Sequence, residues 1–479
     1  MKYKISLLLI LFSVFVYSKN VCDCKKIIHF VSKQVEENSA SYHHQVISQK
    51  KKSDYRKHKK HIENIAKTAF TNRQCLGVLQ YYFSFLKDNH QGIFVTNDYY
   101  PFTTFSDTVS VKKFIKENVE NISLKNNENK GMEGIWHHES GIFNIQIQKT
   151  NQKERPFVGV LTQDIRINNQ FLGFKGDVKI DIYRNYKGNL QAIFWDFGQK
   201  PITYELAFSD QKLKIGNVTF YRNSVSKEKK KKFQLPSKTY FKELNKNTNY
   251  FRIHSFDYAN KKNIDSIFSV NKEKLTKPNL IIDVRGNEGG SDWSYQLLLP
   301  YIMDKKEYEK PIIAASIFLS KDNFKSFYND RYKYGVDSRK DSLNADKKME
   351  ALRKYIGSFE PVKNTSKKTI VSSIYDFPQN VYIIQNKQCA SSTEGFILNA
   401  KQSKKVKTFG QNTMGALTYG DWREIQIIDF PARIGLTQKR MIFSNDINLE
   451  MIGITPDVLL NPENEEQWVD IVLQKSISQ

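Results

Sequence analysis

Cysteine is scarce in this chain: 479 residues include only four, at positions 22, 24, 75 and 389. A Cys-x-Cys pair with one distant cysteine is a poor ligand set for zinc. The histidine pairs at 43/44, 58/61 and 137/138 lack a convincing third ligand, so we interpret them as surface residues and expect no metal. In an oxidising compartment Cys75 could pair with Cys22 or Cys24, and the sequence does not choose between them. Cys389 is expected to be a buried free thiol.

Long apolar runs are absent after residue 17. The first four residues, Met-Lys-Tyr-Lys, precede an apolar core of 13 residues, ISLLLILFSVFVY, and Ser18 follows this core. This order is typical of a secretory signal peptide, and the core is too short to span a bilayer comfortably. We predict a signal peptide at 1–18 and an exported protein, periplasmic or secreted, with no integral membrane span. An uncleaved anchor is the alternative.

Acidic residues are too few to balance the basic ones: 50 Asp and Glu face 74 Lys and Arg, which gives a formal charge of +24. Nucleic-acid binding is one explanation of such a charge, but export argues against it. The lysines are scattered, so we interpret most of them as a solvated surface. The lysine-rich tract at 227–232 is expected to be a linker rather than a binding patch, because like charges repel and stay solvated.

About 460 residues remain after the signal peptide, enough for two or three domains. Apolar residues at helical spacing, such as Ile28, Val31 and Val35, predict a helical region over 19–128. Alternation at Phe143, Ile145 and Ile147 predicts an antiparallel β domain over 131–225, a small barrel or a sandwich. A basic linker at 226–248 and an alternating strand–helix pattern at 249–479 follow, which predicts an α/β core. We see no helices that would make the β domain a PDZ domain, and its ligand, if any, stays open.

One histidine stands out by its position. Thr71-x-x-Gln74 resembles a capping box, and the amphipathic helix after it ends at Lys87–Gly92, before the extended run Ile93–Val95. His90 therefore lies in a tight helix-to-strand turn. A lone histidine is most often structural, so this position alone assigns no role.

The stretch from Asn380 to Gly415 predicts a second tight turn. The apolar run 381–384 predicts a buried strand, and the residues after Ser392 have a helical apolar face, with Glu394 in the first turn. Ser391 and Ser392 therefore lie between a strand and a helix start, where backbone N–H groups are free. Acyl transfer needs such a serine beside an anion site. The alternative is that the serines only cap the helix.

Four motifs occur in order over about 180 residues: Asn287-x-Gly-Gly, Ser391-x-x-Glu, Gly410-x-x-Thr-x-Gly and Gly453-Ile-Thr-Pro-Asp. Together they resemble the S41 serine peptidases, which include the C-terminal processing proteases and the tricorn-like enzymes. The resemblance implies a crotonase/ClpP-like α/β core, here with an N-terminal helical subdomain and an inserted antiparallel β domain.

The resemblance also implies roles for single residues. Ser391, three residues before the glutamate, matches the nucleophile, and the N–H groups of Ser392 and Gly289 match the oxyanion hole. The C-terminal processing branch uses a lysine after Thr-x-Gly, but here Ala416 stands there. The tricorn-like branch uses His and Glu instead, and His90 and Glu450 match those positions.

The sequence thus leads to an exported serine endopeptidase that acts on protein or peptide substrates. Ser391 would form an acyl-enzyme, His90 would act as base, and Glu450 would orient the imidazole. We expect no metal or organic cofactor, and the oligomeric state stays open. The alternative is an exported binding or scaffold protein that keeps the S41 core without activity.

Overall fold

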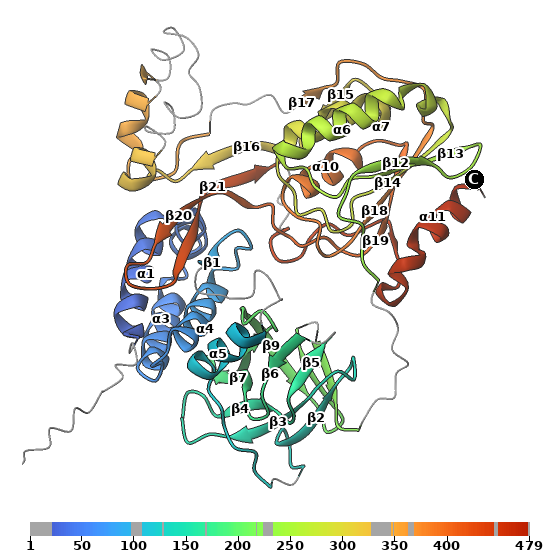
Figure 1. Ribbon diagram of the computed structural model, residues 1–479. Coiled ribbons are helices and arrows are strands. Elements are labelled where there is room, and N and C mark those ends of the chain that lie inside the picture. The colour runs from blue at the N-terminus through green and yellow to red at the C-terminus, as the bar shows by residue number, and fades with distance from the viewer. Residues whose placement is uncertain are drawn as a thin grey trace, which may run out of the picture.

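The computed structural model describes residues 22–96, 108–126, 129–167, 170–216, 218–223, 233–326, 346–347, 349–362, 368–444 and 449–477. The predicted signal peptide and the whole lysine-rich tract at 227–232 lie outside these ranges. Figure 1 shows the parts that the described chain forms: helices from the N-terminal third, a β-barrel, and an α/β core.

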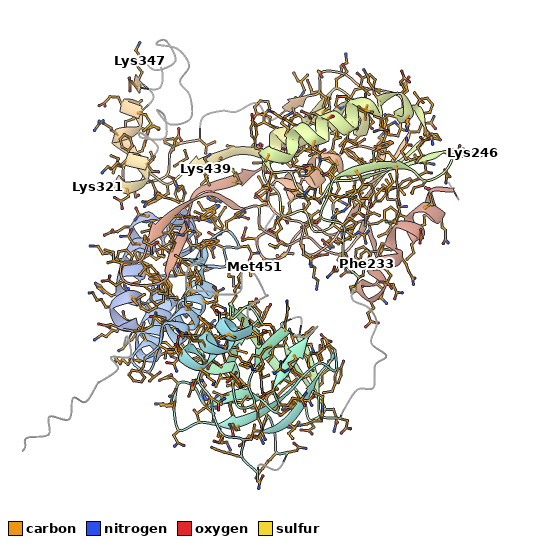
Figure 2. The ribbon with its side chains drawn as sticks, in the orientation of Figure 1. Phe233, Lys246, Lys321, Lys347, Lys439 and Met451 are labelled. Carbon is orange, nitrogen blue, oxygen red and sulfur yellow. A yellow bond between two sulfur atoms is a disulfide. The ribbon has the colours of Figure 1, made fainter. Side chains whose placement is uncertain are left out.

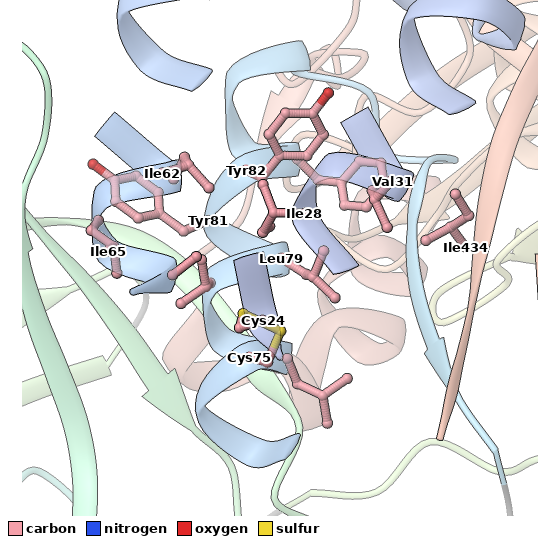
Figure 3. Packing of buried hydrophobic residues seen from close by; sticks show 14 of the residues in the cluster. Cys24, Ile28, Val31, Ile62, Ile65, Cys75, Leu79, Tyr81, Tyr82 and Ile434 are labelled. Carbon is pink, nitrogen blue, oxygen red and sulfur yellow. A yellow bond between two sulfur atoms is a disulfide. The ribbon is translucent and has the colours of Figure 1, made fainter. Parts of the chain in front are cut away.

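The N-terminal helices enclose a hydrophobic core. They are α1 (Cys24–Asn38), α2 (Ala40–Tyr42), the π-helical segment His43–Ser48, α3 (Lys52–Ala66) and α4 (Asn72–Phe83). Ile28, Val31 and Leu79 are fully buried between them (Figure 3). The capping box predicted at Thr71 is confirmed: Gln74 N–H donates to Thr71 Oγ1, and the Gln74 side chain accepts from the Thr71 N–H.

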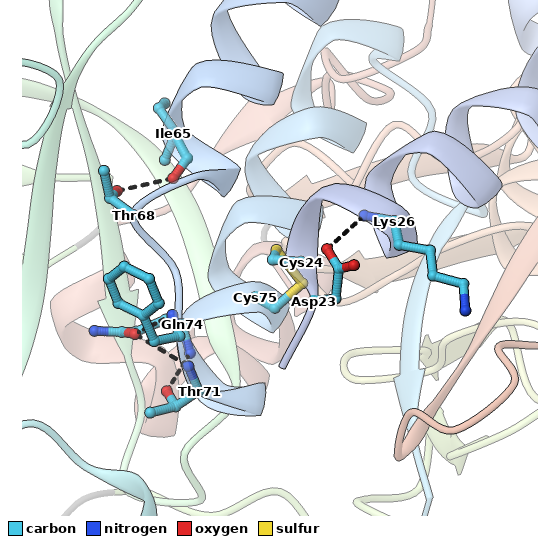
Figure 4. Close-up of a disulfide and its surroundings, with 9 residues drawn as sticks. Asp23, Cys24, Lys26, Ile65, Thr68, Thr71, Gln74 and Cys75 are labelled. Carbon is cyan, nitrogen blue, oxygen red and sulfur yellow. Dashed lines mark hydrogen bonds between the residues drawn. A yellow bond between two sulfur atoms is a disulfide. The ribbon is translucent and has the colours of Figure 1, made fainter. Parts of the chain in front are cut away.

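A disulfide joins the first and last of these long helices. Cys24 at the start of α1 pairs with Cys75 in α4, 51 residues away (Figure 4). This pairing resolves the open choice, and Cys22 is a buried free thiol. Cys389 is also free and buried, as predicted, and its Sγ lies 3.0 Å from the Val284 carbonyl oxygen.

One histidine prediction is wrong. His58 is buried rather than exposed, and its Nε2 lies 3.1 Å from the Tyr82 carbonyl oxygen. The ring also stacks against Phe85, with 5.1 Å between ring centroids. The His58 side chain therefore fills the helical core, because an imidazole can pack as an aromatic ring once one nitrogen has a partner.

The predicted β domain is a closed barrel. Its strands are β2 (Gly134–His138), β3 (Asn144–Lys149), β4 (Phe157–Leu161), β7 (Val178–Arg184), β8 (Leu190–Trp195), β9 (Pro201–Phe208), β10 (Lys212–Ile215) and β11 (Val218–Tyr221), and β11 closes onto β2. A short hairpin, β5 (Ile165–Ile167) and β6 (Gln170–Gly173), lies outside the barrel sheet. Apolar side chains such as Trp136, Ile145 and Phe220 fill the interior. On the outside, Trp195 joins the core of the N-terminal helices.

The α/β core has a six-stranded sheet in the order β12 (Tyr240–Glu243), β13 (Thr248–Arg252), β14 (Asn279–Asp283), β18 (Asn380–Gln385), β19 (Val406–Gly410) and β22 (Val458–Leu459). All pairs are parallel except β12 with β13. β12 lies within the stretch predicted as a linker. The carboxyl ends of parallel strands meet at one edge, so the turns after β14 and β18 are neighbours.

Helices cover both faces of this sheet, as alternation of its buried side chains requires. Ile282 and Ile383 pack on the side of α10 (Ser392–Ala400) and α6 (Tyr258–Val270). Ile281 and Tyr382 pack on the side of α11 (Trp468–Ile477). After the turn that follows β14, the chain forms a 3₁₀ helix, Asp292–Leu298, followed by the short α7 (Leu299–Ile302).

A second sheet connects the core to the N-terminal helices. Its central strand, β21 (Ala432–Phe443), pairs at one end with β1 (Gly92–Val95) and at the other with β16 (Ile312–Ile317). β20 (Tyr419–Gln426) pairs with β21 along its length. Figure 1 shows β21 running from the N-terminal helices to the α/β core. The turn that carries His90 directly precedes β1, so this sheet fixes its position.

None of the helices within the described ranges has the length and apolar character needed to cross a membrane.

Replacing Cys24 or Cys75 with serine should lower the free energy of unfolding by about 4 kcal/mol, since a loop of this length is opened in the unfolded chain. Urea unfolding of the exported protein measures the change. Cys22→Ser is the matched control, because Cys22 is buried nearby but unpaired, and it should cost much less. A larger loss in Cys22→Ser than in Cys24→Ser would contradict this pairing.

Candidate active site

Ser391 occupies a strained position between strand and helix. It precedes α10 and has φ 54° and ψ −122°. A positive φ at a residue other than glycine costs on the order of 1–3 kcal/mol and persists only where the surroundings hold it. Such a turn places the serine side chain at the exposed end of a sheet, as in serine hydrolases with a nucleophile elbow. The contacts that hold this backbone are therefore part of the site.

The buried carboxylate of Glu394 supplies those contacts. Its two oxygens accept hydrogen bonds from the N–H groups of Ser391 (3.1 Å), Gly415 (2.8 Å) and Ala416 (2.8 Å), and from the hydroxyl of Thr413 (2.5 Å). The Ser391 N–H also reaches the Ala416 carbonyl oxygen at 3.2 Å. From its motif, Glu394 was expected only to lie in the first turn of a helix. The spacing of Glu394, three residues after Ser391, is the signal that could have identified it as the carboxylate that holds this turn.

The predicted glycine turn lies against Ser391. Gly289 has φ +102°, and a Cβ there would lie 2.7 Å from the Ala390 carbonyl oxygen and 2.9 Å from Ser391 Cβ. Only glycine allows this approach. The turn is also tied to its neighbour, because Ser392 Oγ donates to the Gly290 carbonyl oxygen at 3.1 Å.

The two predicted oxyanion donors differ in availability. The Ser392 N–H, at the first position of α10, has no acceptor among the residues that the structure describes. The Gly289 N–H instead donates to Asn287 Oδ1 at 3.0 Å. Gly289 can therefore act as an oxyanion donor only if this bond opens when a substrate binds.

The His90 turn lies beside the same loop. His90 N–H donates to Asp88 Oδ1 at 2.9 Å. The Asn89 side chain donates to the carbonyl oxygens of Met414 (3.3 Å) and Gly415 (3.1 Å). We call residues 413–418 the bridging loop, because Glu394 holds one side of it and the His90 turn holds the other. Ser391 and the His90 turn thus both make hydrogen bonds to one short loop.

Glu450 also reaches the bridging loop, but not in the predicted way. Its Oε1 accepts from the Asn89 N–H and its Oε2 from the Thr418 N–H, each at 3.0 Å. The His90 Nδ1 is buried and has no hydrogen-bond partner among the described residues. Glu450 therefore holds the backbone of the His90 turn and does not contact the imidazole by a hydrogen bond. Figure 2 shows its neighbour Met451 between the N-terminal helices and the α/β core.

Burial makes Glu450 difficult to ionise. The side chain is largely buried, and desolvation, followed by the negative charge of Asp88, raises the pKa of Glu450 to about 8. The N–H groups of Asn89 and Thr418 oppose this rise. Two carboxyl groups thus lie at the His90 turn, and a like charge disfavours ionising both.

Glu394→Gln should slow the reaction of Ser391 with a fluorophosphonate about tenfold or more. The glutamine would place an NH₂ group, which cannot accept, against the N–H and O–H donors that now surround the carboxylate. Each charge-assisted hydrogen bond that is lost is worth about 1.5–3 kcal/mol. Labelling rates, followed by mass spectrometry, measure the effect. Glu273→Gln, at an exposed glutamate, is the control. Equal rates in the two variants would contradict a clamping role for Glu394.

Glu450→Gln should flatten the pH dependence of stability. With a raised pKa, folded protein keeps a proton that the unfolded chain has lost, so the free energy of unfolding falls as pH rises from the usual value of 4.5 to about 8. The slope from this group is at most about 1.4 kcal/mol per pH unit. Urea unfolding between about pH 5 and pH 8 should show a shallower slope in the variant. Parallel slopes would show that Glu450 is ionised throughout.

The family model described as Peptidase family S41 matches residues 247–460. No curated protein matches the sequence. Among solved structures, mature CPAF in complex with lactacystin is 13% identical, with a TM-score of 0.48, and the match covers 91% of this chain and 93% of that chain. The photosystem II D1 C-terminal processing protease is 12% identical, with a TM-score of 0.36 and coverage of 92% and 94%.

Proposed function

Residues 247–460 of this chain belong to peptidase family S41, and from this premise we propose that the protein is an exported serine endopeptidase with Ser391 as nucleophile and His90 as base. The observation that carries the proposal is the bridging loop, which joins the strained Ser391 turn, the His90 turn and Glu450 through hydrogen bonds. Strain at Ser391 supports it, because such backbone conformations cluster at active sites.

The reaction follows from these positions. His90 takes the proton of Ser391 as Oγ attacks the carbonyl carbon of a peptide bond. The Ser392 N–H binds the oxyanion, and the Gly289 N–H joins it after leaving Asn287. The C–N bond then breaks, and the protonated His90 gives its proton to the departing amine. Water, deprotonated by His90, attacks the ester, which releases the acid and restores Ser391.

Glu450 has a supporting part in this scheme. It accepts from the N–H of Asn89, the residue before His90, and from Thr418 in the bridging loop. It therefore holds the base at a fixed place relative to the loop beside Ser391. Misplacement by about 1 Å can cost about 100-fold in rate, so this anchoring is expected to matter for turnover.

Export is supported by two features. The N-terminal segment has the order of a signal peptide, and a disulfide joins Cys24 to Cys75. Disulfides persist mainly in oxidising compartments. The protein is accordingly proposed to act on proteins or peptides outside the cytosol.

Fluorophosphonate labelling of the exported protein tests the proposal. Wild type should be labelled at Ser391, and Ser391→Ala should not be labelled. His90→Ala should react at least about 100-fold more slowly than wild type, because it lacks the general base. Mass spectrometry of the labelled peptide identifies the serine.

Ser392→Ala is the matched serine control. It should still be labelled, since the proposed reaction uses the backbone N–H of Ser392, which the variant keeps, and only the hydroxyl contact with the Gly290 carbonyl oxygen is lost. Absence of label on folded wild-type protein would instead favour an inactive S41-fold binding or scaffold protein. Two features favour this alternative: the buried His90 Nδ1 has no hydrogen-bond partner among the described residues, and the Gly289 N–H donates to Asn287.

A further inference from the structure

Met451 and Ile452 are two exposed apolar residues beside the bridging loop, and the proposed reaction gives them no part. They are 53% and 54% exposed, and they directly follow the buried Glu450, which holds the backbone of the His90 turn. Single exposed apolar residues are common on protein surfaces. Exposure alone therefore assigns this pair no role, and its position relative to the site decides.

The segment 449–453 packs tightly against the bridging loop. The Met451 N–H donates to the Gly415 carbonyl oxygen at 2.9 Å. The same oxygen accepts from the Asn89 side chain at 3.1 Å. A Cβ at Gly415 would lie only 2.6 Å from the Ile452 backbone nitrogen. One carbonyl of the loop thus joins Met451 to the residue before His90.

The next carbonyl of the loop joins it to Ser391. The Ala416 carbonyl oxygen accepts from the Ser391 N–H at 3.2 Å. Consecutive Cα atoms are about 3.8 Å apart, so Met451 and Ser391 are bonded to positions one residue apart. Figure 2 shows Met451 between the N-terminal helices, which carry His90, and the α/β core. A polypeptide with its scissile bond between Ser391 and His90 would pass within reach of the Met451 side chain.

The Met451 backbone adopts a conformation that favours glycine. Its φ is +65°, which is uncommon for a residue with a long side chain. Strained backbone of this kind clusters at functional sites. A glycine would meet the same requirement without strain, so the turn itself does not need a methionine.

From this geometry we propose that Met451 and Ile452 form the apolar wall of a substrate subsite, which takes an apolar side chain next to the scissile bond. The inference rests on the proposed function and names its substrate class: polypeptides with leucine, methionine or phenylalanine at that bond. Burial of apolar surface supplies the affinity, while a charged side chain would lose hydration there. Methionine is unbranched and flexible, so apolar side chains of several shapes can fit.

Met451→Gly removes the side chain and keeps the turn. Glycine adopts this φ without strain, so the midpoint of urea unfolding should not fall below that of wild type. The full-length exported protein is given a library of synthetic decapeptides, and mass spectrometry identifies the cleaved bonds. Wild type should cleave next to apolar residues. The ratio of kcat/KM for a leucine peptide to that for its alanine counterpart should fall about tenfold in Met451→Gly, as for other lost apolar contacts in a pocket.

Two further variants complete the cleavage test. Ile452→Ala should lower the same ratio. Asp429→Gly is the matched backbone control, because Asp429 is exposed, has φ +57° and lies between β20 and β21, away from residues 449–453; it should leave the ratio of wild type. An unchanged ratio in Met451→Gly and Ile452→Ala would overturn the inference while the proposed function stands. Cleavage by wild type beside charged residues as readily as beside apolar ones would do the same.

Peptide binding separates this inference from the proposed function, because binding needs no catalysis. The affinities of the leucine and alanine decapeptides are measured by fluorescence anisotropy on Ser391→Ala, with and without Met451→Gly. The added substitution should weaken the leucine peptide about tenfold and the alanine peptide less than about twofold.

The two failures then have different signatures. If wild type is neither labelled by a fluorophosphonate nor cleaves any peptide, but Met451→Gly still weakens the leucine peptide selectively, the proposed function fails and the apolar subsite stands. Equal affinities with and without Met451→Gly, or no binding of either peptide, would overturn the subsite.

Discussion

The site depends on one buried carboxylate, that of Glu394. Three backbone N–H groups and a hydroxyl point at it, from Ser391 and from the bridging loop. A buried carboxylate is costly unless donors surround it. The arrangement fixes the loop to Ser391 and so offsets the strain of its positive φ. The His90 turn and Glu450 then attach to the other side of that loop.

Much of the fold could be predicted from local pattern, because buried parallel strands are short apolar runs bounded by turns. The apolar run at 381–384 became β18, and the alternation near Phe143 became barrel strands. Closure of the barrel could not be predicted, since β11 and β2 lie far apart in sequence and nothing local encodes their pairing. The buried position of His58 was missed for the same reason: its neighbours come from α4 and the segment after it.

For the site, motif positions and spacing identified the turns but not their hydrogen bonds. Ser391, His90 and Glu450 are attached to one loop, yet Glu450 contacts backbone rather than imidazole, and the Gly289 N–H is held by Asn287. Both outcomes depend on groups that come from other parts of the chain or on side-chain geometry within a turn. Asp88 illustrates the point, because its Oδ2 accepts a hydrogen bond from the hydroxyl of Thr437, which is 349 residues away in the sequence.

The twelve-residue strand β21 has a consequence for how the chemistry is assembled. The part of the chain that matches the S41 family, 247–460, holds Ser391 and Glu450 but not His90. The His90 imidazole comes from outside the segment that matches S41, and the pairing of β1 with β21 holds it next to that segment. Its effective concentration at the serine is set by that pairing and by the Asn89 contacts. In the proposed mechanism, loosening the junction of the two sheets would lower the effective concentration of the proposed base His90 at Ser391 without altering any residue around Ser391.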